Sequence, residues 1–433
     1  MSKVQDALRQ FRRLVYQVFE KGRDAAFELI DAIASSPDAR AVVEVSESPL
    51  TQRKFSSVYK ALERACINTA QLRCDLTRHA EEHGQLMVAG YTVYALDHTP
   101  FPRKNAPTVT DRGYVHGADG TVIGHQYSLL GRVMHETGAW IGIVDIARIP
   151  TDRTPVQVGA EQVARLRHTS KHKAIITADS EYPASDLLAQ ASENTELLIR
   201  LKGNRVLFKR PKPRSKGTLG RTKLHGRKIK LSDRRTIGKP HAVQSIVNPD
   251  GSSIEVVVFA DVHFRSNPGL HGHLILIQAF RADLAPKFSR PIWLFWSGSL
   301  DMDWVTFWRV YLKRFCIESI YQFAKNSLVW TRARLGYTDR EETWTWLVML
   351  AYWQLLMAAP FAQDARRPWQ KPMPAGRLPT PARVQRDYFR IFLIVGTPAS
   401  PPKPRGNSPG RPLGYQPKPR PRFPVVYKAI PPR

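Results

Sequence analysis

The sequence is poor in cysteine and in acidic residues. Its 433 residues include three cysteines, Cys66, Cys74 and Cys316, which are too few for a disulfide scaffold. They show no Cys/His spacing typical of a zinc site. The 37 acidic residues are outnumbered by 65 Lys and Arg, so the formal net charge is +28. Because such an imbalance destabilises a compact chain by self-repulsion, we expect a polyanionic partner. Nucleic acid is favoured, and an anionic membrane surface is the alternative.

Long apolar runs are also scarce. The N-terminal stretch MSKVQDALRQFRRLVYQ is charged throughout, unlike a signal peptide. One uncharged window, from Trp344 to Phe361, approaches the length of a membrane span but contains Gln354 and a proline near its end. We therefore predict a buried core helix there, no membrane partner, and a cytoplasmic protein.

Changes in hydrophobic pattern divide the chain into five parts. Residues 1–88 predict a helical domain that either contacts DNA or serves as a structural cap. In residues 89–205, strands in a hairpin precede strands that alternate with helices, which predicts an α/β fold with a mixed sheet flanked by helices. Residues 206–300 read as a basic loop and a β-rich insertion, and residues 301–360 as helices. Residues 361–433 form a basic Pro/Arg-rich tail, expected to be partly disordered.

The basic loop has an extreme composition. From Arg200 to Lys239 there are 16 Lys or Arg and one acid, Asp233. A segment so basic and so rich in glycine and proline cannot pack alone, so it is either a solvated mobile loop or a phosphate-binding loop. The second interpretation is favoured. The candidate DNA-binding residues are Lys209, Arg210, Lys212 and Arg214.

Two aspartates follow short apolar strands. The run YTVYALD ends at Asp97, and KAIITAD ends at Asp179. Strand ends deliver side chains into clefts in open sheets, although an aspartate there is more often a turn residue or a helix cap. Asp145 is a competitor, but the run IVDIARI places it inside a strand.

The stretch YLKRFCIESIYQFAK, Tyr311 to Lys325, is predicted to be a helix. At about 100° per residue, one face carries Tyr311, Arg314, Glu318 and Lys325. The face is either solvated, with an Arg/Glu pair four residues apart, or it presents a carboxylate to a cleft.

Asp97, Asp179 and Glu318 together would form a trio of carboxylates. Like charges around one cleft need cations to stay ionised, and hard oxygen ligands suit Mg²⁺ or Mn²⁺. Two such ions can activate a water or a 3′-hydroxyl and stabilise the leaving oxygen of a phosphodiester. A polycation with this trio points to phosphoryl transfer on nucleic acid.

These motifs carry a family resemblance. The order and spacing of Tyr311, Arg314, Glu318 and Lys325 resemble the Tyr-Arg-Glu-Lys (YREK) signature of a group of bacterial insertion-sequence DDE transposases. The segments YALDHTPFPRK and IITADSEYPASDLL resemble the regions around the first and second Asp of that group. The resemblance covers about residues 90–360. It implies an RNase H-like catalytic domain with a β-rich insertion between the second Asp and the Glu.

The resemblance also implies residue roles. Asp97, Asp179 and Glu318 would be catalytic and would hold the metals, expected to be two Mg²⁺ or Mn²⁺ ions, with no small-molecule cofactor. Tyr311 and the two cations of the signature, Arg314 and Lys325, would contact phosphates near the transposon end.

The implied activity is cleavage of DNA at element ends and strand transfer to target DNA, by a homo-oligomer associated with the bacterial nucleoid. Two alternatives stay open. One is an RNase H-like nuclease that does not join strands. The other is a catalytically inactive DNA-binding protein derived from a transposase.

Three further residues have two interpretations each. His98 departs from the family pattern and either titrates near the metals or caps the strand, which is favoured. Trp293 and Trp296, in PIWLFWSG, are either sheet core, which is favoured, or a platform that stacks on a flipped base.

Overall fold

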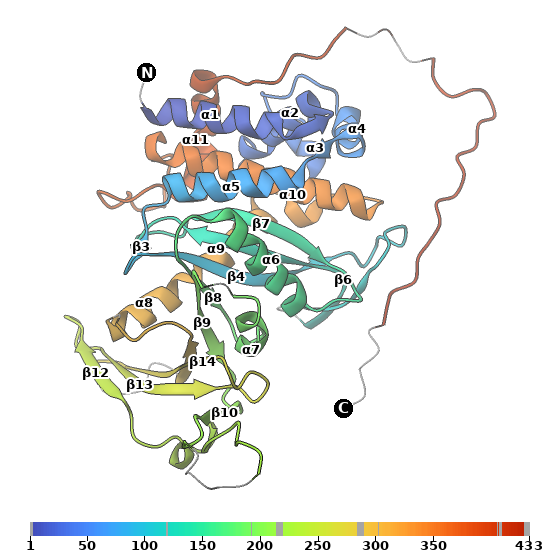
Figure 1. The fold of residues 1–433 in the computed structure, drawn as a ribbon. Helices are drawn as coiled ribbons and strands as arrows, with labels where there is room; N and C mark the ends of the chain where they lie inside the picture. The colour runs from blue at the N-terminus through green and yellow to red at the C-terminus, as the bar shows by residue number, and fades with distance from the viewer. Residues whose placement is uncertain are drawn as a thin grey trace.

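The computed structural model describes residues 3–117, 120–191, 193–213, 220–283, 290–301, 303–404, 406 and 409–427. Helices from both ends of this chain gather at one end of the molecule, above a large mixed sheet (Figure 1). The helices are α1 (Lys3–Gln17), α2 (Arg23–Ala34), α3 (Val42–Val45), α4 (Ser56–Arg64), α5 (Thr69–His83), α6 (Pro155–Thr169), α7 (Ala184–Leu188), α8 (Trp304–Lys313), α9 (Cys316–Asn326), α10 (Thr338–Ala358) and α11 (Pro381–Val395), with 3₁₀ turns η1 (Arg234–Thr236), η2 (Trp330–Arg332) and η3 (Ala359–Phe361). The strands are β1 (Phe19–Lys21), β2 (Cys66–Ile67), β3 (Met87–Val88), β4 (Tyr91–Pro102), β5 (Gly113–Gly117), β6 (Gly120–Val133), β7 (Ile141–Ile149), β8 (Ala174–Ala178), β9 (Thr195–Leu201), β10 (Val206–Lys209), β11 (Lys228–Lys230), β12 (Ala242–Val247), β13 (Ser253–His263), β14 (His271–Phe280) and β15 (Ile292–Trp296).

The described strands form a 13-stranded sheet and a separate pair, β1 with β2. The main path of the large sheet is β11-β10-β13-β14-β15-β9-β8-β4-β6-β5, while β3, β7 and β12 add to β4, β6 and β13. The central strands β4, β8 and β9 pair in parallel, and β6 and β7 form the predicted hairpin. Helices flank this sheet, so the predicted α/β class with a mixed sheet is confirmed.

The β-rich insertion is continuous with the central strands. β15 pairs with β9 in antiparallel register, from Trp293 opposite Leu201 to Trp296 opposite Leu198. Both tryptophans are buried, and the indole nitrogen of Trp296 donates a hydrogen bond to the carbonyl oxygen of Ser299 at 2.7 Å. The sheet-core interpretation is therefore confirmed, and neither ring is available to stack on a base in this conformation.

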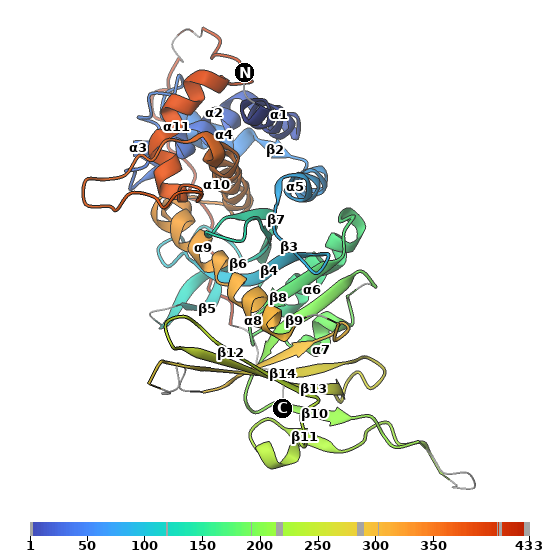
Figure 2. The same cartoon turned by 90° about the vertical axis from the view of Figure 1, so that its left-hand side faces the viewer.

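The long helix α10 is a core helix, as predicted. Thr338–Phe361 is long and apolar enough to cross a membrane by length and composition, yet 89% of its most apolar window is buried inside the protein. It packs against α1, α2 and α11 on one side and β7 on the other (Figure 2). A helix that is apolar on all sides needs such neighbours on all sides.

Helix α11 lies inside the segment that the sequence assigned to the basic tail, and no pattern predicted it. Pro381 occupies its first turn, where the missing N–H costs nothing. Val384, Tyr388, Ile391 and Val395 recur at helical spacing and are buried. The surrounding prolines concealed this amphipathic stretch.

A buried ion pair joins α11 to the N-terminal helices. The Arg12 guanidinium donates hydrogen bonds to Asp31 at 2.6 Å and to the Tyr388 hydroxyl at 2.8 Å, and it also contacts Gln354 of α10. Because α1, α2, α10 and α11 each supply one partner, the two ends of the chain form a single helical body.

Beyond α11 the described chain is mostly exposed and arches away from the body before it returns to the sheet (Figure 1). On its return, the amide of Phe423 donates to the carbonyl oxygen of Pro107 at 2.8 Å, and the amide of Val426 donates to that of Arg112 at 2.7 Å. Val426 also forms a parallel bridge with Gly113 of β5. The tail thus docks on the edge strand.

A buried glutamate ties α10 to the sheet. Glu341 is fully buried and accepts hydrogen bonds from Arg103 at 2.6 Å, from His125 at 2.6 Å and from the Tyr127 hydroxyl at 3.0 Å. Burial alone would raise the pKa of Glu341, but His125 and Arg103 hold it below its ordinary value. The charge is therefore retained because several donors surround it.

Replacing Glu341 with alanine should strongly destabilise the fold. The substitution leaves Arg103 buried without its counter-charge, so we expect the free energy of unfolding to fall by ~3–5 kcal/mol. The matched control is Glu342→Ala, which removes a half-exposed carboxylate paired with Arg148 and should cost less than ~1 kcal/mol. Urea unfolding followed by circular dichroism measures both losses, and equal losses would contradict the assigned role of Glu341.

Candidate active site

Two acidic side chains lie side by side where the central parallel strands separate. The last parallel pair between β4 and β8 is Leu96 with Ala178. Asp97 is the next residue after Leu96, and Asp179 is the next residue after Ala178. Neighbouring strands lie about 4.8 Å apart, so this register sets the two aspartates at the same level on neighbouring segments of the sheet. The structure thus brings together the first two carboxylates of the predicted trio.

The strand that carries Asp97 is longer than predicted. β8 ends before Asp179, but β4 continues five residues past Asp97 to Pro102, and Asp97 pairs with Leu129 of β6. The prediction that Asp97 follows a strand end is therefore wrong. The antiparallel partner β6 extends β4 beyond the point where its parallel partner stops, and the apolar run in the sequence does not reveal that partner.

The predicted single helix over residues 311–325 is also wrong. Arg314 and Phe315 form a turn that separates α8 from α9. Tyr311 therefore belongs to one helix, while Glu318 and Lys325 belong to the next. The predicted common face is replaced by a turn that directs Arg314 toward the sheet.

Arg314 joins the third carboxylate to the first. Its guanidinium lies 3.1 Å from the Glu318 carboxylate and 3.7 Å from the Asp97 carboxylate. Arg314 is buried, and its guanidinium carbon lies 4.5 Å from the centre of the Phe315 ring. Glu318 itself is 48% exposed. The structure therefore places all three predicted carboxylates around one buried cation.

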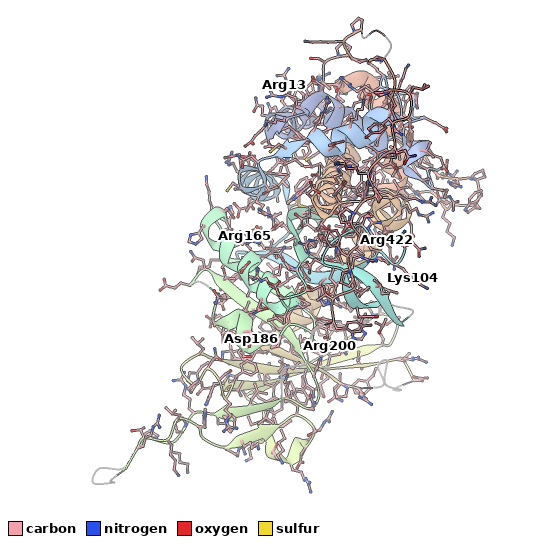
Figure 3. The ribbon with its side chains drawn as sticks, turned by 90° about the vertical axis from the view of Figure 1, so that its right-hand side faces the viewer. Arg13, Lys104, Arg165, Asp186, Arg200 and Arg422 are labelled. Atoms are coloured by element: carbon pink, nitrogen blue, oxygen red, sulfur yellow. The ribbon has the colours of Figure 1, made fainter. Side chains whose placement is uncertain are left out.

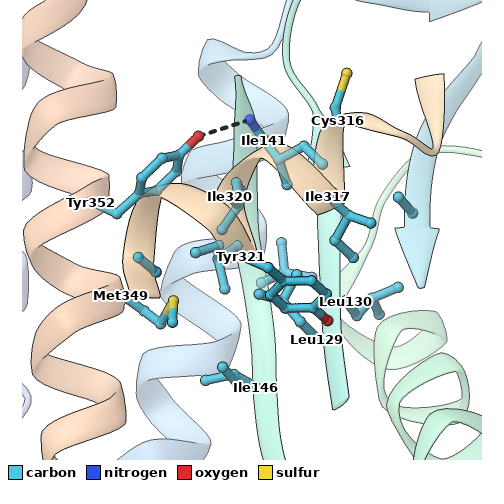
Figure 4. Packing of buried hydrophobic residues seen from close by; sticks show 14 of the residues in the cluster. Leu129, Leu130, Ile141, Ile146, Cys316, Ile317, Ile320, Tyr321, Met349 and Tyr352 are labelled. Atoms are coloured by element: carbon cyan, nitrogen blue, oxygen red, sulfur yellow. Dashed lines mark hydrogen bonds between the residues drawn. The ribbon is translucent and has the colours of Figure 1, made fainter. Parts of the chain in front are cut away.

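Apolar packing fixes α9 over the sheet (Figure 4). The packed side chains include Leu129, Leu130, Ile146, Ile317, Ile320 and Tyr321. The Tyr321 hydroxyl also donates a hydrogen bond to the carbonyl oxygen of Asp97 at 2.9 Å. This bond ties the helix that carries Glu318 to the strand that carries the first aspartate.

The electrostatics of the site are unfavourable to a third negative charge. Burial, and next the Asp179 carboxylate, raise the pKa of Asp97 to about 7 from an ordinary value of 3.8. Glu318 acts in the same direction, while Arg314 and the amide of His98 oppose the shift. Asp97 therefore holds a proton at mildly acidic pH because burial, and next the charge of Asp179, disfavour its ionised form.

This donor set fits hard divalent cations. Arg314 supplies one positive charge against three carboxylates, so the three together can carry more negative charge than it offsets. Carboxylate oxygens are the ligands that Mg²⁺ and Mn²⁺ prefer. Asp97, Asp179 and Glu318 are thus the residues that could hold metal ions here.

A second group of ligating side chains lies elsewhere, on the last turns of α5. Ligand atoms of His79, Glu82 and His83 lie within 4.8 Å of one another. The ring of His79 packs against Phe11 and Trp353, and burial, followed by the charge of His83, lowers its pKa to about 3. A search for paired Cys/His spacings misses this group. The signal available was the HAEEH run, which places these side chains on one face of a helix.

Tyr311 does not lie at an accessible surface. It is fully buried in the core beside Trp308, and its hydroxyl has no hydrogen-bond partner in the described part of the chain. The expected phosphate contact of Tyr311 is therefore not available in this conformation.

Lys325 does lie near the site, where its ammonium donates a hydrogen bond to the Thr99 hydroxyl at 2.6 Å. Burial lowers the pKa of Lys325.

The candidate residues of the basic loop differ in their surroundings. Lys209 donates a hydrogen bond to a backbone carbonyl of β13, and Arg210 pairs with Asp261 at 2.7 Å. These two residues anchor the base of the loop. Lys212 is exposed, and Arg214 lies outside the described residues.

Two other candidates are resolved by their contacts. His98 lies inside β4, so the prediction that it caps a strand is wrong. Its ring contacts Tyr182, and burial lowers its pKa.

Asp145 lies inside β7, as predicted, and pairs with Arg73 at 2.6 Å and with Arg165 at 2.8 Å. Asp145 therefore joins helices to the sheet and is not part of the carboxylate trio.

Comparison with known proteins gives a match to one part of the chain. Residues 146–252 match the family described as DDE superfamily endonuclease. The chain is similar to DDE superfamily endonucleases. The match covers about a quarter of the chain and includes Asp179, while Asp97 and Glu318 lie outside it. The likeness agrees with the mixed sheet flanked by helices and supports a transposase- or nuclease-type function. A search of curated proteins gives no match.

Replacing Asp97 with asparagine should stabilise the metal-free protein at high pH. The folded protein holds the Asp97 proton up to about pH 7, whereas the unfolded chain releases it near 3.8. Unfolding therefore becomes easier as the pH rises between these values. We expect the Asp97→Asn variant, in EDTA, to melt higher than the wild type at pH 8 and equally at pH 4.

The exposed Asp186 provides the control for this measurement. Its replacement by asparagine should shift the melting temperature little at either pH. A melting curve of Asp97→Asn that tracks the wild type from pH 4 to pH 8 would show that neighbouring charges do not oppose ionisation of Asp97.

Proposed function

We propose that this protein is a metal-dependent DDE transposase of the YREK insertion-sequence group. The observation that carries the proposal is the register that sets Asp97 beside Asp179, with Arg314 linking Glu318 to the pair. The match to DDE superfamily endonucleases supports the same chemistry. The substrate is DNA, as the net charge of +28 favours.

In this proposal Asp97, Asp179 and Glu318 hold two Mg²⁺ or Mn²⁺ ions. The bound ions supply activation of a water or 3′-hydroxyl and stabilisation of the leaving oxygen. Arg314 offsets part of the carboxylate charge in the present structure. Its guanidinium carries the charge and the donors that would suit a phosphate oxygen of the substrate. Lys325 offers a second positive charge on the same helix as Glu318.

We further propose that the protein acts in the bacterial cytoplasm as a homo-oligomer on paired element ends. It would cut at those ends and transfer the strands to target DNA. The second candidate function is a nuclease of the same fold that cuts without joining, because the matching family is described as an endonuclease.

The Asp179→Asn variant should lose strand cleavage while it retains DNA binding. The reason is that a metal ligand is lost while the basic surface is unchanged. The assay uses labelled fragments of the DNA that flanks the gene, with Mg²⁺ or Mn²⁺ and with EDTA, beside a gel-shift measurement. The control is Asp186→Ala, which removes an exposed carboxylate on α7 and should cut at the wild-type rate.

Metal-dependent cuts at the element boundary, absent in Asp179→Asn, would support the proposed chemistry. Equal gel shifts with no cuts in either protein would instead indicate a DNA-binding protein with a disused site. Pre-cut ends with a free 3′-hydroxyl then separate the two candidates, because a transposase joins them to plasmid DNA and a nuclease does not.

A further inference from the structure

A basic groove lies at the end of β4, beyond the candidate active site. It has a volume of about 690 Å³ and runs between the loop that follows β4 and the segment that follows η2. Its charged lining consists of Arg103, Lys104, Arg332, Arg334 and Arg420. None of its lining residues in the described part of the chain is acidic. The groove therefore concentrates positive charge in one concave surface, which favours a polyanion.

The cations of the groove are largely free to meet a ligand. Within the described residues, Lys104, Arg334 and Arg420 form no ion pair. Arg103 is buried, where its Nε atom donates a hydrogen bond to Glu341 and its Nη1 atom donates one to the carbonyl oxygen of Ala333. It therefore adds positive charge to the groove, while the exposed cations supply the free donors.

The C-terminal tail contributes one residue to the lining of this groove. Arg420 lines it, and the Arg420 guanidinium lies 5.3 Å from the centre of the Tyr337 ring. The next residues of the tail dock on the loop, where Phe423 bonds to Pro107. Figure 3 shows Arg422 and Lys104 on the same face of the molecule. Arg420 thus belongs to a segment that reaches the body through a long exposed stretch of the chain.

The groove stands at a defined distance from the carboxylates. Its first lining residue, Pro102, lies five residues beyond Asp97 on β4, which corresponds to roughly 16 Å at about 3.3 Å per residue. One strand of duplex DNA carries a phosphate every ~3.4 Å of helix axis. For a duplex that runs along β4, the groove would meet phosphates about five nucleotides from a phosphodiester held at Asp97.

We infer that this groove binds the phosphate backbone of the DNA that flanks the cleavage site, and that the C-terminal tail clamps that DNA in the groove. The inference rests on the proposed function for the identity of the DNA. Lys104 and Arg334 meet phosphate oxygens. The tail adds Arg420 to the lining, and its docking bonds at Phe423 and Val426 hold it beside the groove without using the lining cations.

The test measures DNA binding against salt concentration, without cleavage, for a Lys104→Glu/Arg334→Glu double variant. The probe is a labelled duplex from the DNA that flanks the gene. Each phosphate contact contributes ~0.9 to the slope of log affinity against log salt. We therefore expect the double variant to lower that slope by about 2 and to bind about tenfold or more weakly at 0.15 M salt. A Lys60→Glu/Arg377→Glu double variant changes the net charge equally at exposed sites outside the groove and should change the slope less.

The tail is tested in the same assay. An Arg420→Glu variant and a chain that ends at Gln416 should both dissociate from the duplex faster than the wild type. Equal melting temperatures in EDTA confirm that each variant folds. If the groove variant and its control have the same slope, the groove is not a DNA site. If the shortened chain releases DNA at the wild-type rate, the tail is not a clamp.

Cleavage by the wild-type protein, measured in parallel, separates this inference from the proposed function. A protein that cuts DNA while its groove variant binds normally overturns the inference and leaves the proposed function intact. A protein that binds DNA through the groove but does not cut overturns the proposed function alone.

Discussion

The parallel register between β4 and β8 is the constraint on which the site depends. Because the last paired residues are Leu96 and Ala178, backbone hydrogen bonding between the strands sets Asp97 and Asp179 side by side at the same level. Two carboxylates so placed repel each other, and the sheet cannot move them apart without losing its ladder. The surroundings must compensate, and Arg314, held at the turn between α8 and α9, does so in this structure. The packing of α9 and the turn hold the guanidinium where this pairing requires a positive charge.

Buried carboxylates elsewhere in the described part of the chain are also compensated by nearby cations. With 37 acids against 65 Lys and Arg, no carboxylate needs to stay without a cation, and the buried ones are surrounded by donors. Glu341 has Arg103 and His125, and Asp145 has two arginines. These pairs join helices to the sheet, whereas the three site carboxylates share one arginine. That imbalance distinguishes the site from the structural ion pairs, and no count of charged residues in the sequence reveals it.

Local patterns predict the features that local interactions determine. The two aspartates could be found because each ends a short apolar run in the sequence, although only Asp179 lies beyond its strand. Helix α10 could be found because its residues are apolar on every side. The burial of Tyr311 and the turn at Arg314 could not, since a helical repeat continues across a break that only packing against the sheet imposes. Helix α11 was concealed for a related reason, because composition over a long window outweighs an amphipathic repeat of four residues. The docking of Val426 on β5 is set by a partner more than 300 residues away in the chain, and sequence patterns carry no record of such a pairing.

The continuity between β9 and β15 has a mechanical consequence. A lid on a flexible hinge can swing without disturbing the strands below it. Here four antiparallel residue pairs, from Trp293–Leu201 to Trp296–Leu198, make the insertion part of the central sheet. Any force that a bound polymer exerts on the insertion is therefore transmitted through β9 to β8, the strand that precedes Asp179. The insertion and the strands of the site should therefore move together. They should also unfold, and exchange their amide hydrogens, as one cooperative unit.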